Sequence, residues 1–321
     1  METAKVAILL STYNGAEYLN EQIESIEQQT YVNWQLYIRD DGSKDQTTKI
    51  IQQYQQRDSR IHFLNKGHIE NVGVKRSFMN LLANTQADYY MFCDQDDVWL
   101  TEKVAWTLTE MQQNERSAVP CLVHTDLMVV DQDLKAQRVM FGRDFQDAFR
   151  DVLYSNSVTG CTIMLNEALR QILLQQSFDW QRIVMHDWWF ALVAAAFGDI
   201  YYLAKPTILY RQHGDNTFGA DVNGLQRMRR FFKMENEVQR FTAALRQDNY
   251  FAEVFSNDVR ISATNRRYLR ITVDMLHSEN SMVAIEALVK GKARKSTLKG
   301  TILMWYVMIF RHKALTENMG R

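Results

Sequence analysis

Short apolar runs alternate with amphipathic stretches along the first hundred residues of the chain. Each apolar run ends in a polar turn, as buried strands do, and the runs cover residues 6–10, 34–38, 60–64 and 89–93. The stretches between them have helical periodicity and cover residues 16–29, 45–56 and 74–84; in the first, Leu19, Ile23 and Ile26 share one face. Strands separated by helices of this length form a parallel sheet with crossovers, so the pattern predicts an α/β fold.

The pattern changes near residue 225. Residues 226–232, 235–246 and 260–277 are expected to be helical and are rich in arginine and aromatic residues. We therefore expect an α/β domain over residues 1–222 and a helical region over residues 223–321. The longest late apolar run, residues 301–310, is about half as long as the roughly 18 residues of a spanning helix.

Charge divides the chain at the same place. The net charge is -1, but residues 1–222 hold 19 Lys and Arg against 29 Asp and Glu, whereas residues 223–321 hold 18 against 9. This asymmetry favours an acidic catalytic half and a basic tail that meets an anionic surface. Nucleic acid and the cytoplasmic face of a membrane are both such surfaces, but the tail holds no recognisable nucleic-acid-binding motif.

The three cysteines, Cys93, Cys121 and Cys161, are too few for a disulfide framework and form no CxxC pair. They are expected to be small buried residues in a reducing compartment. The N-terminal residues lack the features of a signal peptide, so the expected location is cytoplasmic.

Three polar clusters follow directly after predicted strands: STYNG at 11–15, DDGSKD at 40–45 and DQDD at 94–97. In parallel sheets, ligands bind at the carboxyl ends of the strands. The three clusters are therefore expected to form one binding site.

The DQDD cluster carries the strongest chemical signal. Its carboxylates repel one another, and a bound cation offsets that repulsion. Oxygen ligands favour Mg²⁺ or Mn²⁺, bound partly through substrate phosphates. The structural alternative is a solvated acidic turn before the helix expected at Thr101.

The other clusters each have a functional and a structural interpretation. A carboxylate of the adjacent pair Asp40 and Asp41 could accept the N–H of a pyrimidine base, or the segment could be a turn in which Asp45 caps the next helix. The segment NVGVKR at 71–76 offers two cations near a helix start, which suits a diphosphate, although such loops are often merely solvated.

Two later segments also contain candidate residues. In HDWW at 186–189, Asp187 beside two indoles would be partly desolvated, which raises a carboxyl pKa toward the range of a general base. The alternative is an N-cap aspartate with core tryptophans. In YRQHGDN at 210–216, His213 is a candidate third metal ligand, although a lone histidine is usually structural. For His124 and Asp126 we favour a structural role.

The set of motifs resembles the family 2 inverting glycosyltransferases, whose nucleotide-diphospho-sugar-binding (GT-A, Rossmann-like) fold has a mostly parallel sheet. The resemblance spans roughly residues 4–220. Seven segments carry it in order: STYNG (11–15), DDGSKDQT (40–47), NVGVKR (71–76), DQDDVW (94–99), TGCTIM (159–164), HDWW (186–189) and YRQHGDN (210–216). The last two segments, together with DQDDVW, look most like bacterial α-1,3-L-rhamnosyltransferases of cell-wall polysaccharide synthesis.

The resemblance implies a role for each matching residue. A nucleoside pocket would be lined by Ser11, Tyr13 and Asp41, and Arg76 would approach the diphosphate. Asp94 would contact the ribose or the metal, and Asp96 would bind the metal directly. His213 would lie near the metal and the diphosphate as a candidate metal ligand, and Trp188 and Trp189 would pack beside donor sugar or acceptor. Asp187 would be the catalytic base. The additional Asp97 leaves open which carboxylates reach the ion.

The reaction implied is transfer of L-rhamnose from TDP-β-L-rhamnose to a hydroxyl of a lipid-linked saccharide. UDP-glucose or UDP-galactose as donor, a sugar nucleotidyltransferase and a non-catalytic sugar-nucleotide-binding module are the alternatives. The basic segment 290–299 and apolar segment 301–310 suit a helix lying on the membrane, or else a homo-oligomer interface or a buried terminal helix.

Overall fold

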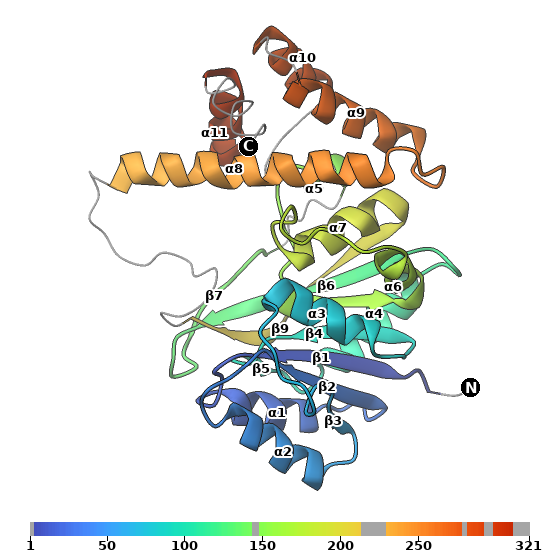
Figure 1. Cartoon of the computed structure of the whole chain (residues 1–321), viewed down its shortest axis with the longest axis vertical. Helices are drawn as coiled ribbons and strands as arrows, with labels where there is room; N and C mark the ends of the chain where they lie inside the picture. The colour runs from blue at the N-terminus through green and yellow to red at the C-terminus, as the bar shows by residue number, and fades with distance from the viewer. Residues whose placement is uncertain (1–2, 143–147, 213–228, 278–280, 292–297, 311–321) are drawn as a thin grey trace. The chain divides into compact units, whose positions relative to one another are not determined.

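The computed structural model describes residues 3–142, 148–212, 229–277, 281–291 and 298–310, shown in Figure 1. The chain divides into two compact units. The first comprises Met1–Phe145, Val158–Ser177 and Gly198–Ala220, and the second Gln146–Ser157, Phe178–Phe197 and Asp221–Arg321. The predicted boundary at residue 222 lies outside the described residues. The second unit also takes two segments from the chain before that boundary.

A nine-stranded mixed sheet forms the first unit, with the strand order β3-β2-β1-β4-β8-β6-β9-β5 and β7 paired to β6. The strands β3, β2, β1 and β4 are parallel, β8 is antiparallel to both of its neighbours, and β6 is parallel to β9. The strand bounds are β1 Val6–Thr12, β2 Trp34–Asp40, β3 Ile61–Phe63, β4 Tyr89–Cys93, β5 Val98–Trp99, β6 Cys121–Val130, β7 Ala136–Val139, β8 Ile163–Asn166 and β9 Asp199–Arg211.

Period-two alternation sends the residues of each central strand to two buried faces. On β4, Met91 joins the apolar cluster under α1 (Leu19–Glu27), α2 (Thr47–Arg57) and α4 (Lys103–Asn114). Its neighbour Phe92 points to the opposite face and meets Phe78 of α3 (Val74–Ala83). Tyr90 also lies on that face and donates to Glu167 of α6 (Glu167–Leu174). Burial on both sides explains why these strands read as continuous apolar runs.

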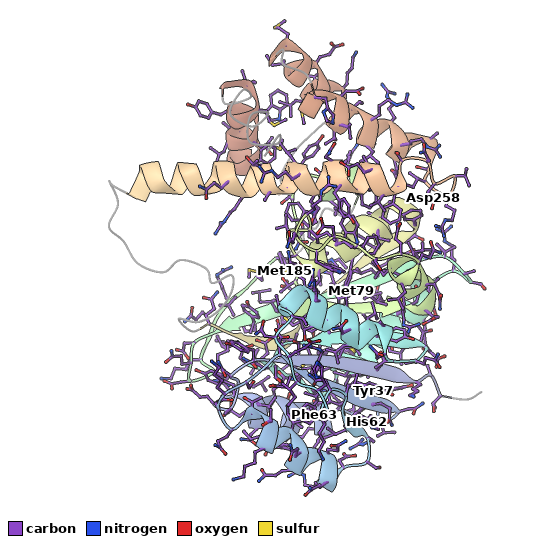
Figure 2. The ribbon with its side chains drawn as sticks, in the orientation of Figure 1. Tyr37, His62, Phe63, Met79, Met185 and Asp258 are labelled. Carbon is purple, nitrogen blue, oxygen red and sulfur yellow. The ribbon has the colours of Figure 1, made fainter. Side chains whose placement is uncertain are left out.

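At one end of the sheet, β2 and β3 are paired in parallel. Tyr37 of β2 and His62 of β3 are register partners, and their rings stack with centroids 4.9 Å apart (Figure 2). His62 also shares a 2.6 Å hydrogen bond with the Gln35 side chain.

The described part of the second unit is helical. It contains α5 (Phe149–Val152), α7 (His186–Phe197), α8 (Arg229–Phe255), α9 (Ala263–His277), α10 (Ser281–Gly291) and α11 (Leu298–Phe310). Helix α7 is apolar on all sides and is buried along almost its whole length, because aromatic residues of α8 pack against it. None of the described helices is both long and apolar enough to cross a membrane.

The predicted strands and helices of the first hundred residues are confirmed, with bounds that differ by at most three residues. Two later expectations are corrected. The helices expected at 235–246 and just before it belong to one continuous helix, α8, from Arg229 to Phe255. The alternative of Asp187 as an N-cap residue is wrong, because α7 begins at His186 and Asp187 lies within its first turn.

Candidate active site

The carboxyl ends of β1, β2 and β4 lie side by side at one edge of the sheet. Leu10 of β1 is the register partner of both Ile38 of β2 and Cys93 of β4. The polar clusters at 11–15, 40–45 and 94–97 begin just beyond these residues, so the expectation that they share one edge is confirmed. Open parallel sheets bind ligands at this edge.

Hydrogen bonds join the first two loops into one structure. The Asn14 N–H donates to Ser43 Oγ at 2.8 Å, and the Lys44 N–H donates back to Asn14 Oδ1 at 2.8 Å. Asp45 accepts from the N–H groups of Ala16 and Thr47, both at 3.0 Å. Burial raises the pKa of Asp45, but hydrogen bonds from the Thr47 hydroxyl and these N–H groups outweigh it and leave that pKa lowered.

The side-chain amide of Gln95 joins the first loop to the acidic cluster. Its Oε1 accepts from the Tyr13 N–H at 2.8 Å, and its Nε2 donates to the Tyr13 carbonyl at 3.0 Å. The amide lies against Gly15, where a β-carbon would be only 2.2 Å from Oε1. Tyr13 is 49% exposed.

Asp41 is buried and accepts three hydrogen bonds. The Arg39 guanidinium donates to its Oδ1 at 2.6 Å, and the N–H groups of Val72 and Gly73 donate at 2.8 and 2.9 Å. Gly73 has a φ of +81°, the left-handed region that favours glycine, and it directly precedes α3. Asp41 therefore fixes the start of the 71–76 segment. Its expected contact with a pyrimidine stays a prediction.

Two further expected residues lie beside this segment. Ser11 is partly exposed, and its hydroxyl shares a 2.6 Å hydrogen bond with that of Ser77 on α3. Ser77 also accepts from Arg39 at 3.1 Å, which links the β1 and β2 loops to the helix. Arg76 is exposed on the first turn of α3, where a cation can meet a ligand phosphate.

Burial distinguishes the carboxylates of the acidic cluster. Asp94 and Asp96 are partly exposed, whereas Asp97 is 1% exposed. Asp97 accepts from the Arg211 N–H at 3.2 Å, and the Arg211 side chain donates to the Asp96 carbonyl at 3.0 Å. Burial, Asp96 and Asp94 all raise the pKa of Asp97.

The cluster contains ligand types that suit a hard divalent cation. One ligand atom each from Asp94, Asp97 and Cys161 lies within 4.8 Å of the others. Burial raises the pKa of the Cys161 thiol, and a sulfur ligand suits softer metals than Mg²⁺ or Mn²⁺. The carboxylate oxygens that remain fit Mg²⁺ or Mn²⁺. The expected ligand His213 lies outside the described residues.

A fully buried lysine, which the sequence patterns did not reveal, lies behind the cluster. Lys103 Nζ donates to Thr207 Oγ1 at 3.3 Å and lies 4.7 Å from the centre of the Trp99 ring. Burial lowers the pKa of Lys103 to about 8, although Cys161, Cys93 and Asp97 act in the opposite direction. Because the charge of Asp97 acts on Lys103, this cation offsets part of the negative charge of the cluster.

The HDWW residues belong to the second unit. Asp187 is 9% exposed and accepts from the Trp188 N–H at 2.6 Å. Trp188 donates from its indole to the Val152 carbonyl at 2.7 Å. Trp189 is fully buried and packs against Phe178, Tyr250, Phe251 and Phe255. These contacts explain Trp189 as a core residue, and a contact of either tryptophan with a sugar stays a prediction.

Sequence reasoning missed four residues that organise the edge: Arg39, Ser77, Gln95 and Arg211. Arg39 and Arg211 had a detectable signal, because each is a cation within or at the end of a mostly apolar strand. Ser77 and Gln95 had none, because their partners are 66 and 82 residues distant in sequence. His124 and Asp126 are buried on β6, as expected for structural residues.

The sequence pattern of glycosyl transferase family 2 matches residues 7–173. The dTDP-rhamnosyl transferase RfbG of Shigella flexneri is 26% identical over 259 residues, which cover 75% of this chain and 86% of that protein. The matched family segment includes every cluster of the sheet edge, whereas Asp187 lies beyond it.

Two solved structures have a similar fold. Residues 1–349 of S. aureus TarS, in complex with UDP-GlcNAc, superpose with a TM-score of 0.57 at 14% identity, over 97% of this chain and 92% of that one. The mannosyltransferase PcManGT from Pyrobaculum calidifontis, in complex with GDP-Man and Mn²⁺, gives a TM-score of 0.53 at 12% identity, over 99% and 85%.

Proposed function

The chain belongs to glycosyl transferase family 2, and from that premise we propose that it transfers L-rhamnose from TDP-β-L-rhamnose to a hydroxyl of a lipid-linked saccharide. The observation that carries the proposal is the shared edge of β1, β2 and β4, where three polar loops meet. The similarity to a dTDP-rhamnosyl transferase over most of its length supports the choice of sugar.

Different residues at this edge would bind different parts of the donor. The exposed Tyr13 ring and Ser11 suit the nucleoside end, and the exposed Arg76 suits the diphosphate. Asp94 and Asp96, the partly exposed carboxylates, would hold Mg²⁺ or Mn²⁺, with His213 as a further ligand. When bound, the ion offsets negative charge on the departing nucleoside diphosphate. Arg76 adds a positive charge for the same group.

Asp187 is proposed as the base that removes the proton from the acceptor hydroxyl. That oxygen then attacks the anomeric carbon from the face opposite the leaving group, so a β-linked donor gives an α-linked product. The resemblance of the HDWW segment to family 2 glycosyltransferases supports this role, and Asp187 lies in the first turn of α7, where it is 9% exposed.

Replacing Asp187 with Asn tests the base. A general base contributes roughly 10²–10⁴ to the rate, so turnover of Asp187→Asn should fall by that factor while donor binding persists. Product formation from radiolabelled donor reports turnover, and calorimetry reports binding. A variant that retains near-full activity would show that another group removes the proton.

Binding of candidate donors tests the sugar without an acceptor. TDP-rhamnose, UDP-glucose, UDP-galactose and GDP-mannose are each titrated by calorimetry with and without Mn²⁺. Metal-dependent binding of TDP-rhamnose alone is the expected result. Preference for a UDP-sugar would keep the transferase and exclude rhamnose as the sugar, and binding of none would favour a non-catalytic protein.

The basic C-terminal region is proposed to bring the enzyme to the inner face of the cell membrane, where a lipid-linked acceptor lies. Helices α10 and α11 expose Met282, Val289, Ile302 and Tyr306. The basic sequence of residues 290–299 joins the two helices, although residues 292–297 lie outside the described residues. Apolar side chains beside cations suit an anionic lipid surface. A homo-oligomer interface is the alternative use of these side chains.

A further inference from the structure

We propose that Gln95 is a positioning residue that holds Tyr13 in place at the nucleoside end of the donor site. The inference rests on the proposed function, since it assumes that Tyr13 contacts the nucleoside. Gln95 itself would contact neither sugar nor phosphate.

Both sides of the Gln95 amide form hydrogen bonds with the same residue, Tyr13. A glutamine amide has one acceptor and one donor side, and here they engage the N–H and the carbonyl of Tyr13 at 2.8 and 3.0 Å. Both main-chain groups of Tyr13 are thereby fixed. Backbone pairing between β1 and β4 ends at Leu10 and Cys93, so the amide extends the link between these strands beyond their last paired residues.

The loop leaves space for the Gln95 amide at Gly15. A β-carbon on residue 15 would lie 2.2 Å from Gln95 Oε1 and 2.5 Å from its Cδ, well inside any normal contact. The buried Gly15 N–H donates to Thr47 Oγ1 at 2.9 Å, which fixes the loop from its other side. Glycine at this position therefore makes room for the Gln95 side chain.

A functional reason for this arrangement is the exposure of Tyr13. Tyr13 is half exposed, so its side chain has little packing to fix its position. A loop that is ordered before the ligand arrives loses less conformational entropy on binding. Gln95 adds to the order that the hydrogen bonds with the 43–47 segment give this loop, and it does so from the segment that also carries Asp94 and Asp96.

The test compares Gln95→Met, which keeps the side-chain length but removes both hydrogen bonds, with Gln53→Met on the exposed face of α2. We expect Gln95→Met to weaken binding of TDP, or of UDP if the wild-type protein prefers it, about tenfold, and Gln53→Met to leave it unchanged. Affinity for Mn²⁺ alone should stay within about twofold in both variants. Circular dichroism and the thermal midpoint report whether each variant folds.

A double-mutant cycle separates positioning from a general structural effect. If Gln95 acts through Tyr13, then Tyr13→Ala combined with Gln95→Met should bind the nucleotide no more weakly than Tyr13→Ala alone. If the two substitutions instead weaken nucleotide binding by independent factors that multiply in the double variant, Gln95 acts elsewhere and the inference is overturned.

A second cycle uses the close contact at Gly15. Gly15→Ala alone should weaken nucleotide binding, because its methyl group collides with the amide, and Gln95→Ala should remove most of that additional loss. An equal loss in both backgrounds would contradict the inference. Nucleotide binding that survives in Gln95→Met overturns the role of Gln95 alone, whereas a wild-type protein that binds neither TDP nor UDP overturns the proposed function together with it.

Discussion

At the scale of single residues, burial assigns different tasks to neighbouring carboxylates. Asp96 is partly exposed, while Asp97 is buried and accepts from the main chain at the end of β9. The sequence alone could not separate them, because both follow the same strand. Solvent access makes Asp96 the better candidate ligand, although Asp97 lies within the group of ligand atoms around Asp94.

Paired substitutions check this assignment. We expect Asp96→Asn to lower metal-dependent TDP affinity by at least about tenfold, because a neutral amide binds Mn²⁺ poorly. Asp97→Asn should stay within a few-fold of wild type. Calorimetric titration of TDP with and without Mn²⁺ measures both, and the reverse order would identify Asp97 as the ligand.

The buried His124 predicts how stability depends on pH. Burial lowers the pKa of His124 to about 3, partly opposed by a backbone hydrogen bond near Thr125, and its ring stacks on Tyr202 with centroids 4.9 Å apart. The unfolded chain binds a proton at His124 more tightly than the folded chain does, so acid favours unfolding. The contribution of neutral His124 to the free energy of unfolding is therefore complete above about pH 6.5 and is lost as the pH falls toward 3. The full effect is up to about 5 kcal/mol.

His124→Phe keeps the stacked ring and removes the titrating group. The free energy of unfolding of this variant should therefore decrease less steeply with acidification over that window, as urea titrations at several pH values would show. Replacement of the exposed His68 by alanine is the control and should leave the slope as it is. An unchanged slope in His124→Phe would assign the acid sensitivity to other groups.

At the scale of elements, hydrophobic periodicity and turn residues predicted the strands and helices of the first hundred residues. Strands buried on both faces and amphipathic helices came out within a few residues of their bounds, and their order predicted the edge at which the loops meet. The antiparallel strand β8 between β4 and β6 could not be predicted, because strand order depends on contacts distant in sequence. Arg39 had a signal, as a cation in a mostly apolar strand, but the pattern did not show that it pairs with Asp41, which looked free to bind a base.

The Arg39–Asp41 pair fixes the loop before α3, and its loss should be costly. Asp41→Asn leaves a buried guanidinium without its counter-charge, so we expect the free energy of unfolding to fall by about 3–5 kcal/mol. Denaturant unfolding measures it. The exposed pair Arg57–Glu27 provides the control, and Glu27→Gln should cost less than about 1 kcal/mol. Similar losses in the two variants would mean that the buried pair is not special.

At the scale of the whole molecule, opposite charges divide along the chain, with an acidic first part and a basic last part. This predicts binding to vesicles that contain anionic lipid. The fraction that sediments with phosphatidylglycerol vesicles should be high at low salt, fall at high salt and be small with neutral vesicles.

Replacing Ile302 and Tyr306 by serine should weaken this association further, if the exposed face of α11 enters the lipid surface. Val32, an exposed apolar residue of the first unit, provides the matched control as Val32→Ser. Sedimentation that is independent of lipid charge would instead favour the homo-oligomer interface.

The path of the chain between its two units has a consequence for how such enzymes diversify. In sequence, α7, which carries Asp187, lies between two segments of the first unit. Its buried Trp189 nevertheless packs on Tyr250 and Phe251 of α8. A single crossover near residue 222 between two related genes would therefore pair α7 of one parent with α8 of the other. Viable hybrids should need matched exchange of residues 178–197 as well, so the two segments are expected to be inherited together.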